Sequence, residues 1–191
     1  MFFACSAVNK QPDKAKNEFI SAVVSFDTLQ KAHIDTITYE IKGQIRQIGK
    51  PQKLVFPAYS QSDTIYYWVL MDGKSACFSI NWHINEKESI WPTFFVYDGQ
   101  LIHARLMHSD NTPGKKSVSE SMTYLEDGKI IWCEERGGSP NENERPMVVR
   151  MRNFTKSTKS YNEIEEEVIG SWEKLYDFMK KENAMPSTIK R

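Results

Sequence analysis

This sequence has few cysteines, no net charge and no long apolar run. Three cysteines are too few for a disulfide scaffold or a four-cysteine zinc site. Lysine plus arginine equals aspartate plus glutamate, at 25 each. This balance argues against a nucleic-acid partner, because binding to phosphates needs a surplus of positive charge. No apolar stretch approaches the roughly 18 residues that a transmembrane helix needs, so we expect no membrane span within the chain.

Apolar and aromatic side chains are plentiful. Hydrophobic residues make up 40% and aromatic residues 12% of the 191 positions, which is enough for a sizeable core and excludes disorder over most of the length. At roughly 150 residues per domain, the length predicts a single domain. We place this domain at residues 17–183, after a tether over residues 1–16 and before a tail over residues 184–191.

Three Asp-Gly pairs divide the middle of the chain at intervals of 26 and 29 residues. They are Asp72-Gly73, Asp98-Gly99 and Asp127-Gly128, each flanked by β-branched and aromatic residues. This pattern predicts β-hairpins with type I′ turns, which need φ > 0 at both central positions. We expect antiparallel pairing of sequential strands over residues 53–58, 64–71, 74–83, 91–97, 100–107, 118–125, 129–135 and 146–152.

Apolar residues recur at helical spacing on either side of these strands. After Ser160 a stripe steps by 4, 4, 3 and 4 residues, and Ser160 with Glu163 has capping-box spacing. A second stripe, from Ile34 to Ile48, steps by 3, 4, 4 and 3, although part of it also alternates as a strand would. The fold predicted is α+β: an antiparallel β-meander of about seven to eight strands with an N-terminal and a C-terminal helix packed on the sheet. The stripes consist of Ile34, Ile37, Ile41, Ile45 and Ile48, and of Ile164, Val168, Trp172, Leu175 and Met179.

The first residues resemble the end of a bacterial lipoprotein signal peptide. An apolar start ends in Ala4-Cys5, and a polar stretch containing Pro12 follows. In that family the signal peptidase cuts before the cysteine, which then carries the lipid; Ala4 matches the small residue at the cut, whereas Phe2 and Phe3 depart from the pattern. The resemblance implies lipidation of Cys5, contact with a membrane through that lipid, and a location at the bacterial cell envelope.

Only four residues precede Cys5, too few for an export signal. On this interpretation Met1 is an internal methionine of a longer reading frame. The alternative is a cytoplasmic protein with a frayed apolar N-terminus and a buried Cys5.

Two hairpin units carry a second resemblance. Residues 93–102 and 121–131 align when one extra residue is allowed in the second unit. The pattern looks like that of a group of uncharacterised bacterial secreted or lipid-anchored proteins, in which a helical segment precedes strand units of the form aromatic-x-x-Asp-Gly-Lys-Leu-Ile. The resemblance covers residues 17–135. It implies a fold type and an envelope address, and no catalytic residue.

Motifs for catalysis are missing from the sequence. It contains no Gly-x-Ser-x-Gly elbow, P-loop or dinucleotide-binding fingerprint. His103 and His108 lie five residues apart without a third metal ligand, so we expect no metal and no cofactor. Cys133 is a poor nucleophile beside two glutamates. Strand parity places Cys77 and Cys133 on opposite faces, which predicts two buried free thiols.

Aromatic residues concentrate on the predicted hairpins. Their enrichment in strands favours a core packed beneath the helices, while a face of exposed aromatics would be a recognition surface. The candidate surface residues are Trp82, Trp91, Phe94, Tyr97 and His103. We therefore expect a lipid-anchored, non-catalytic envelope module that binds a protein, for which an immunity or inhibitor protein is one form. The alternative is a cytoplasmic small-ligand carrier or enzyme whose sheet curls around its ligand.

Overall fold

The computed structural model describes residues 14–58, 60–113, 116–140 and 149–191, with their side chains outside 14–27, 139–140 and 149–150. In this part of the chain one antiparallel sheet runs in the order β1 to β8, and β9 pairs with β7. The predicted α+β meander is therefore confirmed. The strands are β1 (Gln52–Val55), β2 (Thr64–Val69), β3 (Ala76–His83), β4 (Glu88–Tyr97), β5 (Gln100–Asp110), β6 (Ser117–Glu126), β7 (Lys129–Pro140), β8 (Val149–Met151) and β9 (Thr155–Lys156).

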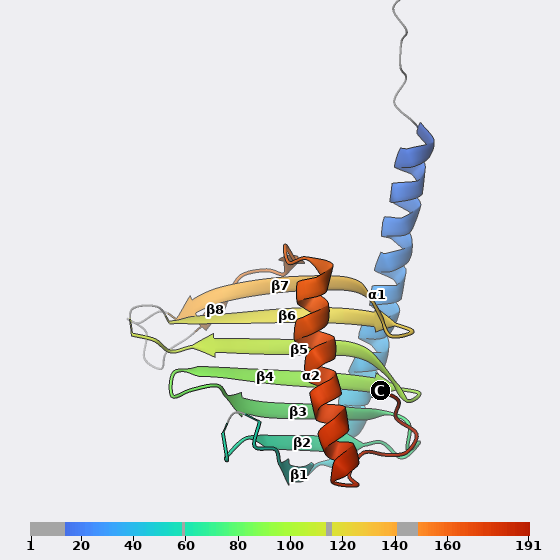
Figure 1. Ribbon diagram of the computed structural model, residues 1–191. Helices are drawn as coiled ribbons and strands as arrows, with labels where there is room; N and C mark the ends of the chain where they lie inside the picture. The colour runs from blue at the N-terminus through green and yellow to red at the C-terminus, as the bar shows by residue number, and fades with distance from the viewer. Residues whose placement is uncertain (1–13, 59, 114–115, 141–148) are drawn as a thin grey trace, which may run out of the picture.

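Helices α1 (Lys14–Ile48) and α2 (Tyr161–Lys181) cover opposite faces of the sheet. Figure 1 looks onto the α2 face, and α1 crosses behind the strands. The stripe of α2 is buried in the larger core, where Trp172 contacts Phe78 and Phe94. The stripe of α1 packs in a smaller core, where Ile37 and Ile41 lie with residues of β3 and β4. The predicted α2 stripe is thus buried throughout, whereas the α1 stripe is buried at Ile34, Ile37 and Ile41 and ends at Ile48, which is 45% exposed.

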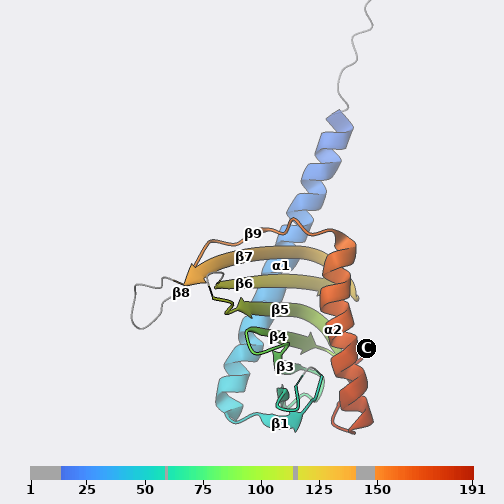
Figure 2. The same cartoon turned by 60° about the vertical axis from the view of Figure 1, so that its left-hand side comes forward.

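Helix α1 is longer than its apolar stripe. Its 35 residues span about 52 Å at 1.5 Å per residue, and its N-terminal part extends beyond the sheet (Figures 1 and 2). The helix ends where predicted, before Gly49, whose φ of 81° is left-handed. The Gly49 backbone N–H donates to the carbonyl of Ile45 at 2.9 Å and closes the last turn.

The β4–β5 and β6–β7 hairpins repeat one geometry. Asp98 and Gly99 have φ of 47° and 80°, and Asp127 and Gly128 have φ of 49° and 74°, as type I′ turns require. In each hairpin the register shifts close to the turn, between Phe95 and Val96 and between the equivalent residues of β6. The two sequence units therefore correspond to two structural units, each with a turn and a β-bulge.

The first Asp-Gly pair forms a different turn, which corrects the prediction of a third type I′ hairpin. Only Gly73 of this pair has a positive φ, at 65°. The Asp72 carboxylate instead accepts the backbone N–H groups of Lys74 and Ser75, both at 2.8 Å, and the Ser75 hydroxyl at 2.6 Å. Burial opposes the charged form, but these hydrogen bonds keep the pKa of Asp72 below its usual value. An aspartate that caps its own turn widens the loop, so β2 ends two residues before its predicted end and β3 begins two residues after its predicted start.

The C-terminal segment, residues 184–191, is part of the domain rather than the predicted tail. Its side chains Met185 and Ile189 are buried in the larger core. The Lys190 backbone N–H donates to the carbonyl of Gly99 at 2.7 Å, and the Tyr176 hydroxyl donates to the carbonyl of Ile189 at 3.2 Å. Two apolar residues in so short a segment give no periodic pattern, which is why the sequence did not reveal this packing.

Candidate recognition surface

The five residues predicted to form a recognition surface lie in different environments. Trp82 and Phe94 are buried against α2, with exposed fractions of 3% and 0%, and His103 is buried beneath α1 at 2%. Tyr97 is exposed beside the β4–β5 turn, and Trp91 is half-buried on β4. The prediction is therefore wrong for Trp82, Phe94 and His103. Because a helix covers each face of the sheet, aromatic residues of either strand parity become core.

His103 is an uncharged core residue. Its ring packs between Phe95, at 5.4 Å between centroids, and Tyr124, at 4.8 Å. Neither ring nitrogen has a hydrogen-bond partner among the described residues. Burial, helped by the positive charges of Lys42, Lys31 and Arg105, lowers the pKa of His103 to about 3. At neutral pH the imidazole therefore contributes packing and not charge.

A polar network attaches α1 to the sheet next to His103. The Tyr124 hydroxyl lies 3.0 Å from Asp35 on α1 and 3.3 Å from Glu134 on β7. Lys31 bridges the same two carboxylates, at 3.1 Å and 3.5 Å. Burial and the two neighbouring carboxylates raise the pKa of Tyr124, so this hydroxyl stays protonated and donates.

A buried carboxylate on the α1 side of the sheet holds two arginines. The Glu120 side chain is only 1% exposed, and its Oε1 accepts from Nε of Arg105. Its Oε2 accepts from Nε of Arg136 at 2.5 Å, and the same oxygen forms an ion pair with Nη2 of Arg136 at 2.5 Å. The arginine side chains are 37% and 29% exposed, so each has one edge buried on Glu120 and another edge at the surface. Glu120 thereby fixes the positions of two positive charges that remain accessible.

Neighbouring groups add rigidity and positive charge. The Arg136 guanidinium lies 4.3 Å from the ring centre of Phe154, within the range of a cation–π contact. Lys42 of α1 lies 5.0 Å from the centre of the Phe95 ring. Burial and the charge of Arg105 lower the pKa of Lys42, which indicates that these two cations share one neighbourhood. Asp35 and Glu120 act on Lys42 in the opposite sense, so the neighbourhood contains three cations and two carboxylates.

Strand register places half-buried apolar side chains beside this cluster. Glu120 pairs with Met107, which in turn pairs with Trp91, and Arg105 pairs with Thr93. Because directly paired residues point to the same face, Trp91 and Met107 adjoin Glu120 and its arginines. Tryptophan, methionine and arginine are the residue types enriched at protein interfaces. We call the set Trp91, Arg105, Met107, Glu120 and Arg136 the arginine surface.

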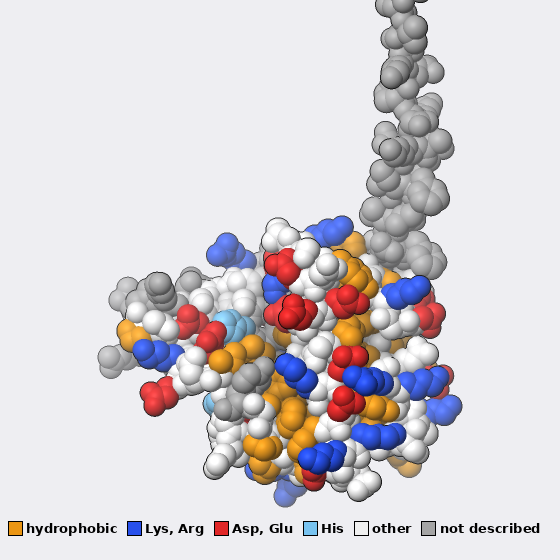
Figure 3. All heavy atoms as spheres, in the orientation of Figure 1, with side chains coloured by type: hydrophobic (Ala, Val, Ile, Leu, Met, Phe, Trp, Pro, Cys, Tyr) orange, Lys and Arg blue, Asp and Glu red, His pale blue; other side chains and the backbone are white. Residues whose placement is uncertain are grey.

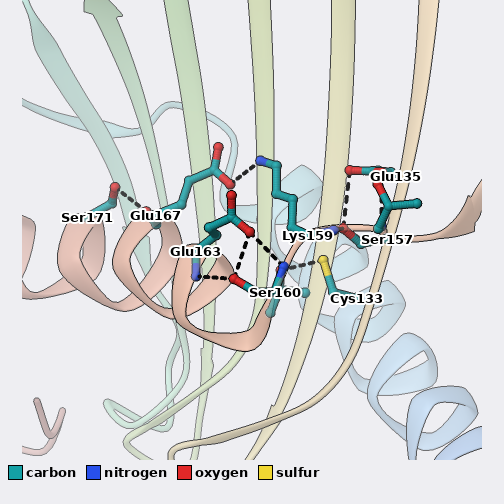
Figure 4. Close-up of polar contacts among 10 residues, drawn as sticks. Cys133, Glu135, Ser157, Lys159, Ser160, Glu163, Glu167 and Ser171 are labelled. Atoms are coloured by element: carbon teal, nitrogen blue, oxygen red, sulfur yellow. Dashed lines mark hydrogen bonds and ion pairs between the residues drawn. The ribbon is translucent and has the colours of Figure 1, made fainter.

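The opposite face carries a polar cleft near the start of α2. Figure 4 shows the Ser160–Glu163 capping box, the Lys159–Glu167 ion pair at 2.5 Å, and Glu135 accepting from the Ser157 hydroxyl at 3.2 Å. Glu135, Lys159 and Glu167 border a cavity of about 330 Å³. Both signs of charge are interspersed over this face (Figure 3), so no single charge dominates it. The cavity also includes Ile90, Leu106, His108, Ser119, Glu120 and Ser121 in its lining.

A second cavity on the α2 face has a volume of about 460 Å³. Leu101, Leu125 and Trp172 line it, and Lys190 and Arg191 form part of its rim. The Trp172 indole nitrogen has no hydrogen-bond partner among the described residues. Ile169, which is half-buried, also lines it, so its lining has four apolar residues beside the charged groups at its rim.

Neither described cysteine has the properties of a nucleophile. Cys77 and Cys133 are free and buried, in cores on opposite faces of the sheet, as strand parity predicted. Burial raises the pKa of Cys77 to about 12 and also raises that of Cys133. Cys5, the predicted lipidation site, lies outside the described residues. Within the described ranges, no group of three histidine, cysteine, aspartate or glutamate residues is placed to hold a metal ion.

Comparisons with known proteins found no relative of this chain. No family model, no curated protein and no solved structure matches it. Among the helices that the structure describes, none combines the length and apolar character needed to cross a membrane.

Sequence reasoning selected aromatic residues and missed the arginine surface, apart from Trp91. Arg105 and Arg136 lie at half-buried strand positions and Glu120 at a buried one, where alternation predicts surface charges. A regular two-residue turn at Asp127-Gly128 would place Glu120 opposite Glu135. The sequence pattern therefore predicts two like charges across these strands and not an ion pair. The extra residue in the second hairpin unit precedes the turn, whereas the bulge that brings Arg136 opposite Glu120 follows the turn at Ile131, so the alignment of the two units does not reveal it.

Proposed function

We propose that this chain is a lipid-anchored, non-catalytic binding module of a bacterial cell envelope, tethered through Cys5, that recognises a protein with its arginine surface. The observation that carries the binding role is the buried Glu120, which holds two partly exposed arginines beside Trp91 and Met107. An immunity or inhibitor protein that blocks a toxin or hydrolase is one form of such a module, and it needs no active site of its own.

Two features support the anchor. The residues around Cys5 resemble a lipoprotein cleavage site. Helix α1 extends past the sheet toward its N-terminal end (Figure 2), an arrangement that would hold the strands away from a membrane surface. A helix is a stiff spacer at about 1.5 Å per residue, so the distance would be set by the helix more than by the tether.

Palmitate labelling of the full-length gene product tests the anchor. We expect label in the natural protein, none in Cys5→Ala and unchanged label in Cys77→Ala, because the Cys77 thiol is buried. An absence of label in the natural protein, or persistence of the label in Cys5→Ala, would remove the anchor from the proposal.

A photo-crosslinking amino acid tests the recognition role in the native host. Placed at Trp91, it should give a defined crosslinked product, because this side chain adjoins the arginine surface. The matched control is Tyr161, which is 50% exposed on α2, on the other face of the sheet. Equal products from both positions, or none from position 91, would argue against a binding site around Trp91.

The second candidate function is a cytoplasmic carrier of a small ligand, and the cavity of about 460 Å³ beneath α2 favours it. The DNA immediately upstream of Met1 separates the two candidates. An in-frame extension encoding a basic and then apolar segment supports the envelope module. An in-frame stop codon close upstream, with a ribosome-binding site before Met1, supports the carrier.

A further inference from the structure

We propose that the partner presents an acidic polypeptide segment, whose carboxylates bind to Arg105 and Arg136. This inference rests on the proposed binding role and adds the chemistry of the partner. Glu120 accepts from the Nε of each arginine. An arginine has five N–H donors in a planar fork, and the donors left free by Glu120 determine what else can bind.

Arg105 has the larger set of free donors. Its Nε donates to Glu120, and neither of its terminal nitrogens donates to any residue that the structure describes. Its guanidinium is therefore fixed along one edge, and the side chain is 37% exposed. A carboxylate fits the paired N–H groups of a guanidinium with two parallel hydrogen bonds. Because Glu120 already orders Arg105, the entropy lost when a second carboxylate binds is smaller than for a free arginine.

Arg136 lies at the edge of the arginine surface. Besides its contacts with Glu120 and Phe154, it borders a cavity of about 480 Å³. Ser119 and Glu135 also line that cavity and belong to the cleft on the α2 face, so the cavity does not lie wholly on the arginine surface. We therefore assign the carboxylates of the partner to Arg105 and Arg136 alone.

The apolar residues beside the arginines favour a polypeptide segment over a single small anion. Arg105 lies on β5 and Arg136 on β7, with β6 between them, and both guanidinium groups converge on the carboxylate of Glu120. Carboxylates of one peptide segment can therefore reach both arginines. Trp91 and Met107 supply apolar contact for the same peptide, as the core of a protein interface requires.

Fluorescence anisotropy with a labelled peptide of alternating glutamate and serine tests the proposal. The full chain should bind this peptide and should not bind the same peptide with glutamine in place of glutamate. The affinity should fall steeply between about 0.05 and 0.5 M salt, because the contact is between partly exposed charges.

Variants of single arginines locate the site. Arg105→Gln should weaken binding by at least about tenfold, and Arg105→Lys, which keeps the charge and loses the fork, should give an intermediate loss. Arg191→Gln is the matched control, because Arg191 is an exposed arginine paired with Glu173 and Asp177 on the α2 face. A thermal melt of each variant shows that it is folded. Arg105→Gln leaves Glu120 paired with Arg136, so its fold should persist.

Three outcomes would overturn the proposal: no binding of the glutamate peptide, equal binding by Arg105→Gln and the natural protein, or displacement of the peptide by equimolar inorganic phosphate. The last outcome would assign the arginines to a phosphate group. If crosslinking at position 91 still succeeds, the binding role stands and only the acidic character of the partner fails. If both experiments fail, the recognition role fails as well.

Discussion

Glu120 lies directly opposite Arg136 across β6 and β7, with its carboxylate 2.5 Å from the arginine Nη2. A regular hairpin turning at Asp127-Gly128 would oppose Glu120 with Glu135, a pair of like charges. The bulge beside Tyr124 moves the register by one residue and replaces that repulsion with an ion pair. One extra residue in a strand thus creates the arginine surface.

Glu120→Gln should lower the free energy of unfolding by about 1–3 kcal/mol. Glutamine keeps one acceptor oxygen, but its amide group turns a donor toward an arginine and leaves two cations without their shared counter-ion. The partial exposure of both arginines allows water to compensate some of this loss. Urea denaturation measures the effect. Glu165→Gln, at an exposed position of α2, is the control and should change stability by less than about 0.5 kcal/mol. Equal midpoints for the two variants would mean that Glu120 does not organise the arginines.

Acid should destabilise the domain through His103. The buried imidazole has a pKa of about 3, below its ordinary value of 6.5, so folding disfavours its protonated form. The contribution of His103 to stability is therefore complete above about pH 6.5 and is lost as the pH falls toward 3, by about 1.4 kcal/mol for each pH unit over that window. Asp35 partly offsets this effect, while Lys42, Lys31 and Arg105 add to it.

Stability measured between pH 7 and pH 4 checks this prediction by comparing variants. His103→Phe should flatten the dependence, because phenylalanine keeps the ring stack with Phe95 and Tyr124 and cannot bind a proton. His33→Gln is the control, since His33 is exposed on α1, and it should follow the natural protein. If the slope of His103→Phe equals that of His33→Gln, the acid sensitivity comes from other groups.

The regular parts of the fold could be predicted because each depends on local sequence. The stripe from Ile164 to Met179 and the type I′ turns at Asp98-Gly99 and Asp127-Gly128 were predicted from spacing and turn chemistry, and the structure confirms them. The Asp72-Gly73 turn differs because its aspartate side chain binds the turn backbone, which a dipeptide pattern does not reveal.

The recognition surface was predicted poorly for a different reason. Whether an aromatic residue on a strand is exposed depends on what covers that face, and here α1 and α2 cover both faces. Trp82 and Phe94 therefore became core. The arginine surface depends on a bulge, and a bulge changes which residues oppose each other over the rest of the hairpin. Neither effect can be read from residue type and spacing alone.

Ser160→Ala should reduce stability by about 1 kcal/mol, because it removes the cap of α2. The Ser160 hydroxyl accepts the Glu163 backbone N–H at 3.3 Å, and the Glu163 carboxylate accepts from the Ser160 backbone N–H at 2.8 Å and from its hydroxyl at 2.7 Å. These hydrogen bonds from Ser160 lower the pKa of Glu163. The variant should therefore also move this pKa up toward its ordinary value, which an NMR titration of the carboxylate detects. Asn162→Ala, in the first turn but outside the capping box, should leave that pKa unchanged. An unaltered titration in Ser160→Ala would contradict the cap.

Alanine at three glycines should give three different stabilities, because each glycine serves a different purpose. Gly99 and Gly128 have φ of 80° and 74°, where a β-carbon costs roughly 1 kcal/mol. A β-carbon on Gly128 would have no atom within 4 Å, so Gly128→Ala should lose about that much stability. A β-carbon on Gly99 would overlap the backbone carbonyl of Thr188 in the C-terminal segment. Gly99→Ala should therefore be the least stable variant, since it must also displace residues that cover the core.

Gly170 lies inside α2 with open space around it, so Gly170→Ala should stabilise the domain by about 0.5–1 kcal/mol through helix propensity. Thermal melts should rank Gly170→Ala above the natural protein, then Gly128→Ala, then Gly99→Ala. Equal melting of the Gly99 and Gly128 variants would mean that residues 184–191 do not pack on the β4–β5 turn.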